Sequence, residues 1–178
     1  MLRIILVYGA IAGVIVGAPM LWAMLATDLN GPMPENGALV GYATMLVALT
    51  AVFLGVKHYR DKERGGVIKF LPALGVGLGI SAVASLGWVI AWEISLAVTK
   101  FDFVAAYFGQ LIEQAQAEGA MEKVAKLQGE QASYAAMYAN PLYRVPITFV
   151  EMFPVGAVIS LVSAGLLRNS RFLPARAA

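Results

Sequence analysis

Four long apolar runs constrain this chain more than any other feature of its sequence. Residues 4–26 and 38–56 contain no charged side chain, and residues 70–98 and 146–167 contain one each. A helix needs about 20 residues to cross the roughly 30 Å hydrocarbon core of a bilayer, so each run can span it. The chain is 60% hydrophobic and 13% charged, whereas soluble domains are about 45–50% apolar and about 25% charged. We therefore predict an all-α membrane protein with four transmembrane helices.

The first run has a competing interpretation as a cleaved signal peptide, with Arg3 as its basic residue. However, the run is longer than the roughly 7–15 apolar residues of a signal peptide, and no clear cleavage motif of small residues follows it. We expect an uncleaved span, and we expect residues 1–178 to form a single integral-membrane domain.

The longest stretch outside the four runs separates the third from the fourth. Apolar residues recur in it at helical spacing from Phe103 to Ala115, Gly119 is a plausible helix stop, and a second amphipathic run ends at Asn140-Pro141. This pattern predicts an extracytoplasmic amphipathic helical hairpin over residues 102–139. The hairpin could lie on the membrane, against the bundle or against a partner.

Basic residues gather in the connection between the second and third runs. Residues 57–69 hold five of the thirteen Lys and Arg side chains, namely Lys57, Arg60, Lys62, Arg64 and Lys69. With Arg3 and the three arginines after residue 167, nine basic residues lie on one side of the predicted membrane and four on the other. Because cytoplasmic loops are enriched in Lys and Arg, we expect a multi-pass protein of a bacterial inner membrane with both termini cytoplasmic. We expect the connection to be a solvated loop that fixes this orientation and contacts lipid headgroups only incidentally.

Two carboxylates within the apolar runs are the candidate polar site. Glu93 and Glu151 both lie towards the hairpin side of their predicted spans, with Trp92 beside the first and Arg144 just before the fourth span. Ionisable groups within spans are costly and usually face the bundle or a cavity, which suits proton or cation handling. The alternative is that each carboxylate is interfacial and pairs with Lys100, Arg144 or a tyrosine hydroxyl.

Small residues at four-residue spacing allow close helix packing in a bilayer. The glycines predicted to pack in this way lie in the first, third and fourth runs: Gly9, Gly13, Gly17, Gly75, Gly79 and Gly156. The pattern favours a compact bundle. A homodimer formed by the Gly9 face is an alternative use of the same residues.

Other chemistry has little support in the sequence. There is no cysteine and only one histidine, His58, which we expect to be a solvated loop residue, since a metal site needs several ligands. No phosphate-binding or G-x-S-x-G pattern occurs. We expect no catalytic residues, no metal, no cofactor and no nucleic-acid partner. The expected partners are the lipid bilayer and either a second copy or another membrane protein.

Several segments resemble a known family. Gly55-Val56-Lys57-His58-Tyr59-Arg60-Asp61, Trp92-Glu93-Ile94, Tyr138-Ala139-Asn140-Pro141-Leu142 and the segment from Thr148 to Gly156 are similar to signatures of the bacterial domain of unknown function 4199 (DUF4199). The resemblance covers essentially the whole chain. It implies a four-span inner-membrane protein but no activity.

Two function classes follow from these observations. The first is a non-enzymatic membrane scaffold or accessory subunit that uses the hairpin or a bundle face for a partner. The second is a small proton- or cation-coupled transporter that uses Glu93 and Glu151. A lipid-modifying enzyme is disfavoured because no nucleophile and base are evident.

Overall fold

The computed structural model describes residues 1–26 and 37–174. Most of the predicted polar connection with Asp28 and Glu35, and the tail residue Arg176, lie outside the described residues. Within them the chain forms six α-helices and one short π-helical segment. In chain order these are α1 (Leu2–Ala26), α2 (Gly37–His58), η1 (Tyr59–Glu63), α3 (Phe70–Thr99), α4 (Phe103–Ala117), α5 (Met121–Tyr138) and α6 (Pro141–Leu167).

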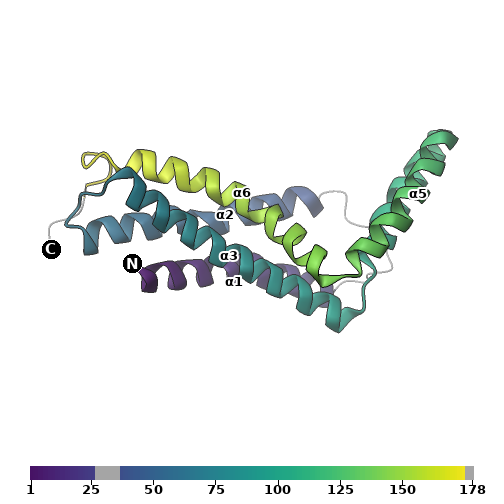
Figure 1. Cartoon of the computed structure of the whole chain (residues 1–178), viewed down its shortest axis with the longest axis horizontal. Helices are drawn as coiled ribbons and strands as arrows, with labels where there is room; N and C mark the ends of the chain where they lie inside the picture. The colour runs from purple at the N-terminus through teal and green to yellow at the C-terminus, as the bar shows by residue number, and fades with distance from the viewer. Residues whose placement is uncertain (27–36, 175–178) are drawn as a thin grey trace.

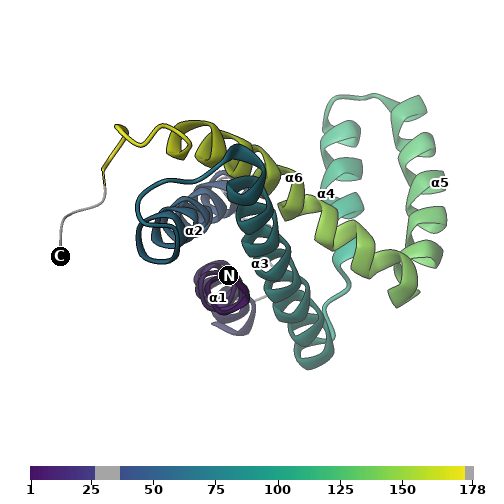
Figure 2. The same ribbon diagram turned by 60° about the vertical axis from the view of Figure 1, so that its left-hand side comes forward.

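Four helices are long and apolar enough to cross a membrane: α1, α2 continued by η1, α3 and α6. They form an elongated bundle in which the start of α1, η1 and the end of α6 lie at one end, here called the tail end (Figure 1). Helices α4 and α5 form an antiparallel pair that projects from the opposite end, here called the hairpin end (Figures 1 and 2). The predicted fold class, a four-span helical membrane protein with a helical hairpin between spans 3 and 4, is confirmed.

The hairpin boundaries follow from local capping. The Asp102 carboxylate accepts the Ala105 N–H at the start of α4, and Gly119 takes a positive φ of 70° between the two helices. The Asn140 side chain accepts the Leu142 N–H at the start of α6. Because this cap is followed by Pro141 at the first helical position, α6 begins five residues before the predicted start of the fourth span at residue 146.

Glycines bring α1 and α3 into backbone contact along a stripe here called the glycine seam. A Cβ atom added to Gly13 would lie 3.2 Å from the Gly87 Cα, and one added to Gly9 would lie 2.5 Å from the Val83 Cβ. Gly17 packs in the same way on Ala91. These glycines therefore pack within the chain, where α3 occupies the Gly9 face, and a homodimer stays a prediction.

Helices α3 and α6 pack through a reciprocal pair of glycines and serines. Cβ atoms added to Gly77 and Gly156 would lie 2.8 Å from the Ser160 Cβ and 2.7 Å from the Ser81 Cβ, respectively. The two serine hydroxyls lie 3.1 Å apart, and each donates to a carbonyl of its own helix. Each glycine therefore makes room for the serine of the other helix, and both of these serine hydroxyls have hydrogen-bond partners.

The remaining glycine predictions have different outcomes. Gly79 packs on the Ile5 side chain, at 2.9 Å from an added Cβ to the Ile5 Cδ1. The packing prediction for Gly75 is wrong within the described chain, because an added Cβ there meets nothing within 4 Å. Helix α3 has two contacting stripes: the predicted one contacts α1 from Gly79 onwards, and a second one, which contains Gly77, contacts α6.

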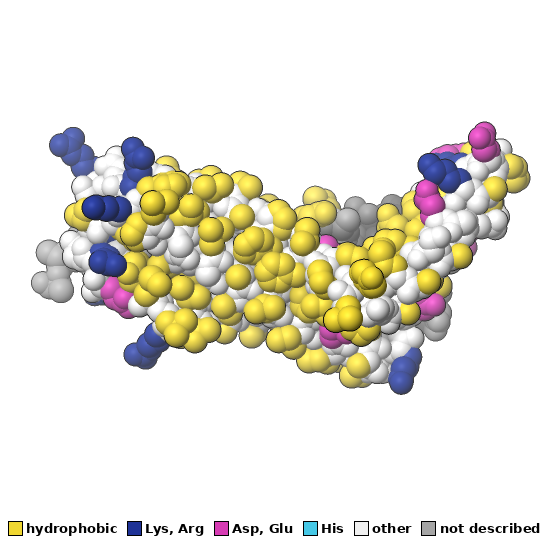
Figure 3. Space-filling view, in the orientation of Figure 1, with side chains coloured by type: hydrophobic (Ala, Val, Ile, Leu, Met, Phe, Trp, Pro, Cys, Tyr) yellow, Lys and Arg dark blue, Asp and Glu magenta, His cyan; other side chains and the backbone are white. Residues whose placement is uncertain are grey.

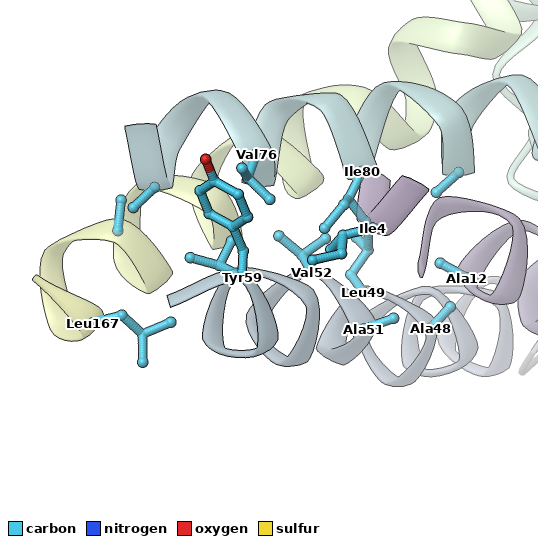
Figure 4. Close-up of a cluster of buried hydrophobic side chains, with 14 of the residues drawn as sticks. Ile4, Ala12, Ala48, Leu49, Ala51, Val52, Tyr59, Val76, Ile80 and Leu167 are labelled. Atoms are coloured by element: carbon cyan, nitrogen blue, oxygen red, sulfur yellow. The ribbon is translucent and has the colours of Figure 1, made fainter. Parts of the chain in front are cut away.

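The apolar core runs along the inside of the bundle and takes residues from all four spans. Towards the tail end Val52 and Val76 are fully buried near Tyr59, and Leu49 and Ile80 are fully buried further along the bundle (Figure 4). Outside this core, hydrophobic side chains cover the middle of the bundle face seen in Figure 3, and most Lys and Arg side chains lie at its two ends. Such a surface is typical of a bundle that lipid surrounds.

Candidate functional site

The predicted polar residues meet at the hairpin end, where α3, α5 and α6 come together. The Arg144 guanidinium donates to both oxygens of Glu93, with Nε–Oε1 at 2.7 Å and Nη2–Oε2 at 2.5 Å. Its Nη1 also donates to the Tyr138 carbonyl at 3.1 Å. A two-pronged guanidinium–carboxylate pair is among the stronger hydrogen-bonded ion pairs. One arginine therefore joins the span α3, the last turn of the hairpin and the start of α6.

An aromatic cluster surrounds this ion pair. The Trp92 indole N–H donates to the Tyr138 hydroxyl at 2.7 Å, and the Trp92 ring packs edge-on against Phe103 with centroids 5.3 Å apart. Tyr134 stacks on Tyr138 from within α5. Burial raises the pKa of Tyr138 to about 12, and the nearby negative charge of Glu151 adds to the increase. The base of the hairpin is therefore held by α3 side chains as well as by Arg144.

Glu151 has a different environment from Glu93. The Trp88 indole N–H donates to Glu151 Oε2 at 3.3 Å, and the residue is exposed on the flank of α6. No hydrogen bond or ion pair joins Glu93 and Glu151 in residues 1–26 and 37–174. The two carboxylates therefore belong to one region but have separate partners, a guanidinium and an indole.

All four residues of the predicted polar site, Glu93, Glu151, Trp92 and Arg144, lie in this hairpin-end cluster. Glu93 pairs with Arg144, as the alternative interpretation of the two carboxylates predicted. Two further members, Trp88 and Tyr138, were not predicted. Trp88 could have been found because it precedes Trp92 by four residues and so shares its helix face. No group of three or more potential metal-ligating side chains occurs in the described part of the chain.

The basic connection at the tail end differs from the solvated loop that we expected. Lys57 lies in α2, and the helix continues through η1 to Glu63. Arg60 is fully buried, which corrects its predicted role as a loop residue. Its guanidinium donates to Asp61 and to the backbone carbonyls of Phe172, at 2.8 Å, and Leu173.

The burial of Arg60 follows from its position on α2. It continues the fully buried stripe of Val52 and Val56 at four-residue spacing. The folded-back tail supplies the carbonyl acceptors that a buried guanidinium requires. Lys62, Arg64 and Lys69 are exposed, as expected of basic residues at a membrane surface. His58 is exposed but not isolated, since its Nδ1 lies 3.1 Å from the Tyr8 hydroxyl.

Comparison with known proteins gives one match. The family model described as "Protein of unknown function (DUF4199)" matches residues 7–169. The matched range includes the whole hairpin-end cluster and Arg60. No curated protein matches the chain, and no solved structure does.

Proposed function

The chain belongs to the DUF4199 family, and on that premise we propose that it is a non-enzymatic scaffold or accessory subunit of a bacterial inner membrane. In this proposal both termini are cytoplasmic and the α4–α5 hairpin faces the other side of the membrane. The distribution of basic residues supports this orientation. The start of α1 and the end of α6 also lie at the end of the bundle opposite the hairpin (Figure 1).

The observation that carries the proposal is the way in which the hairpin is held. Arg144 ties the end of α5 to Glu93 of α3, and Trp92 of α3 binds the Tyr138 hydroxyl. These contacts fix the α4–α5 hairpin, here also called the arm, to a bundle whose helices pack closely through glycine and serine residues. An arm of fixed orientation binds a partner at a lower entropic cost than a flexible one does.

The arm has a surface suited to a partner. A shallow hollow on the hairpin has Phe108, Tyr134 and Met137 among its lining residues, with Lys126 and Glu130 also lining it. In such a surface the apolar side chains supply area that a partner can bury, and the charged side chains beside them orient the partner, as in many protein interfaces. A protein partner at the membrane surface therefore fits this proposal better than a transported ion.

Site-specific photo-crosslinking in intact membranes tests the proposal. A photoreactive residue would replace Ser133, which lines the hollow, and in a separate variant Gln128, which is exposed elsewhere on α5. We expect one discrete protein adduct from Ser133 and little from Gln128. The Arg144→Gln change should reduce the Ser133 adduct, because it releases the arm. Equal, diffuse labelling at both positions would contradict a partner-binding hairpin.

The exposure of Glu151 on the flank of α6 favours the second candidate, a small proton- or cation-coupled transporter. Proton and cation flux into vesicles containing the purified protein would distinguish the two functions. A flux that the Glu93→Gln or Glu151→Gln change abolishes would favour the transporter. Absence of flux in the parent protein, together with the Ser133 adduct, would favour the scaffold.

A further inference from the structure

The segment after α6 folds back onto the bundle and is here called the strap (residues 169–173). Two hydrogen bonds to Asn169 close its turn: the Phe172 N–H donates to the Asn169 carbonyl and the Arg171 N–H to the Asn169 Oδ1, both at 3.0 Å. The Phe172 ring packs edge-on against Phe53 of α2, with ring centroids 6.5 Å apart. Phe172 is the one partly buried side chain of the strap, and the other four are exposed.

The strap covers the guanidinium of Arg60. The Phe172 and Leu173 carbonyls accept hydrogen bonds from its Nη1 and Nη2, respectively, and its Nε donates to Asp61 at 2.6 Å. Lys57 donates to the other carboxylate oxygen of Asp61. Two positive charges therefore share one carboxylate, and the two acceptors that the strap supplies are neutral.

A net positive charge that is largely shielded from water is costly. Arg60 is fully buried, and the side chains of Lys57 and Asp61 are only 29% and 13% exposed. The planar fork of a guanidinium matches two oxygens of a carboxylate or a phosphate, and charged oxygens are stronger acceptors than amide carbonyls. The strap carbonyls therefore stand where an anion would bind Arg60 more strongly.

The strap is held by few contacts. Leu173 has a φ of 47°, in the left-handed region that is unfavourable for leucine. Its side chain is 49% exposed, so burial does little to offset that strain. The Phe172 ring and the Arg60 hydrogen bonds are what keep the strap closed. Its opening would break these contacts and leave the glycine seam and the α3–α6 packing intact.

The position of Arg60 indicates which anion is close at hand. Arg60 lies in η1, which continues the second span as far as Glu63, so it lies where that span meets the lipid headgroups. Lys62 and Arg64 are exposed at the same end, and basic side chains at a membrane surface attract anionic lipids. Headgroup phosphates are therefore concentrated beside the strap.

We propose that the strap is a displaceable cover on a binding site for the phosphate group of an anionic membrane lipid. When the strap opens, Nη1 and Nη2 of Arg60 exchange the two carbonyls for two phosphate oxygens. Asp61 keeps its hydrogen bond from Nε and so holds the guanidinium in orientation. Lys57, which is bound to the same carboxylate, offsets the repulsion between Asp61 and the phosphate.

Native mass spectrometry of the purified full chain tests this site with phosphatidic acid and with diacylglycerol of the same acyl chains, which differ only in the phosphate. Phosphatidic acid should be retained more strongly. The Arg60→Met change should weaken its retention about 10-fold or more, the loss expected for charge-assisted hydrogen bonds. The matched control Lys62→Met removes an exposed charge from the same segment and should leave retention nearly unchanged.

A second variant tests the cover without altering Arg60. Phe172→Ala removes the contact with Phe53, so it should speed tryptic cleavage after Arg171 and raise phosphatidic acid retention about 5-fold, a gain that misfolding does not produce. Unchanged or reduced retention in Phe172→Ala would overturn the proposal, as would equal losses in Arg60→Met and Lys62→Met. Displacement of the lipid by millimolar inorganic phosphate would overturn the assignment to a lipid.

Discussion

Replacement of Gly87 by alanine tests the glycine seam between α1 and α3 most directly. The added Cβ would lie 2.9 Å from the Gly13 Cα, whereas carbon atoms in contact are normally about 3.5–4.0 Å apart. The obstacle is backbone, so no side-chain rotation can relieve the overlap. The two helices would have to separate by about 1 Å, and the flanking contacts of Gly9 and Gly17 would loosen with them.

The expected magnitude combines two opposing effects. Overpacking of a tight contact costs about 1–3 kcal/mol, and the change from glycine to alanine within a helix returns about 0.5–1 kcal/mol. We therefore expect Gly87→Ala to lower the free energy of unfolding by about 1–2 kcal/mol. Gly75→Ala is the matched control on the same helix, because its added Cβ meets nothing within 4 Å. It should be neutral or stabilise the protein.

Denaturation in mixed detergent micelles, followed by far-ultraviolet circular dichroism, measures both variants under the same conditions. The midpoint should fall for Gly87→Ala and stay equal or rise for Gly75→Ala. If both changes raised the midpoint equally, the close approach of α1 and α3 would not exist in the protein, and the reasoning on the seam would fail.

Three further predictions concern the two polar clusters. Arg144→Lys should release the hairpin, because lysine cannot form the two-pronged contact with Glu93. The rate of amide hydrogen exchange in α4 and α5 should then rise by about 10-fold, whereas the control change Lys126→Arg should leave it unchanged. Arg60→Met should free the tail, because the carbonyls of Phe172 and Leu173 lose their donor; faster tryptic cleavage after Arg171 would show this, and parent-like cleavage would contradict it. Raising the pH from about 10 to about 12 should progressively lower the free energy of unfolding. The phenol of Tyr138 loses its proton near pH 10 in the unfolded state, but its pKa in the folded state is raised to about 12. Between these values the folded state keeps a proton that the unfolded state loses, so unfolding becomes more favourable. Tyr138→Phe should lessen that loss in alkaline denaturation.

Length and polarity were sufficient to predict the fold class. Apolar runs of about 20 residues have few ways to avoid water other than to cross a bilayer as helices, and all four predicted spans are present. The ends of the hairpin were also local properties. Asn140 and Pro141 are signals for a helix start that act within one turn. They start α6 at Pro141, five residues before the predicted start of the fourth span.

Helix rotation and burial were decided by the tertiary structure. Gly75 and Gly77 lie on two different stripes of α3, and only the tertiary structure shows that α6 packs on Gly77 while nothing packs on Gly75. Glu93 and Arg144 are far apart in sequence, so their pairing depends on how the hairpin returns the chain to α3. Arg60 shows the same limit at the tail end. Its charge predicted exposure, but a charge can be buried when distant backbone carbonyls accept its hydrogen bonds, and the folded-back tail supplies them.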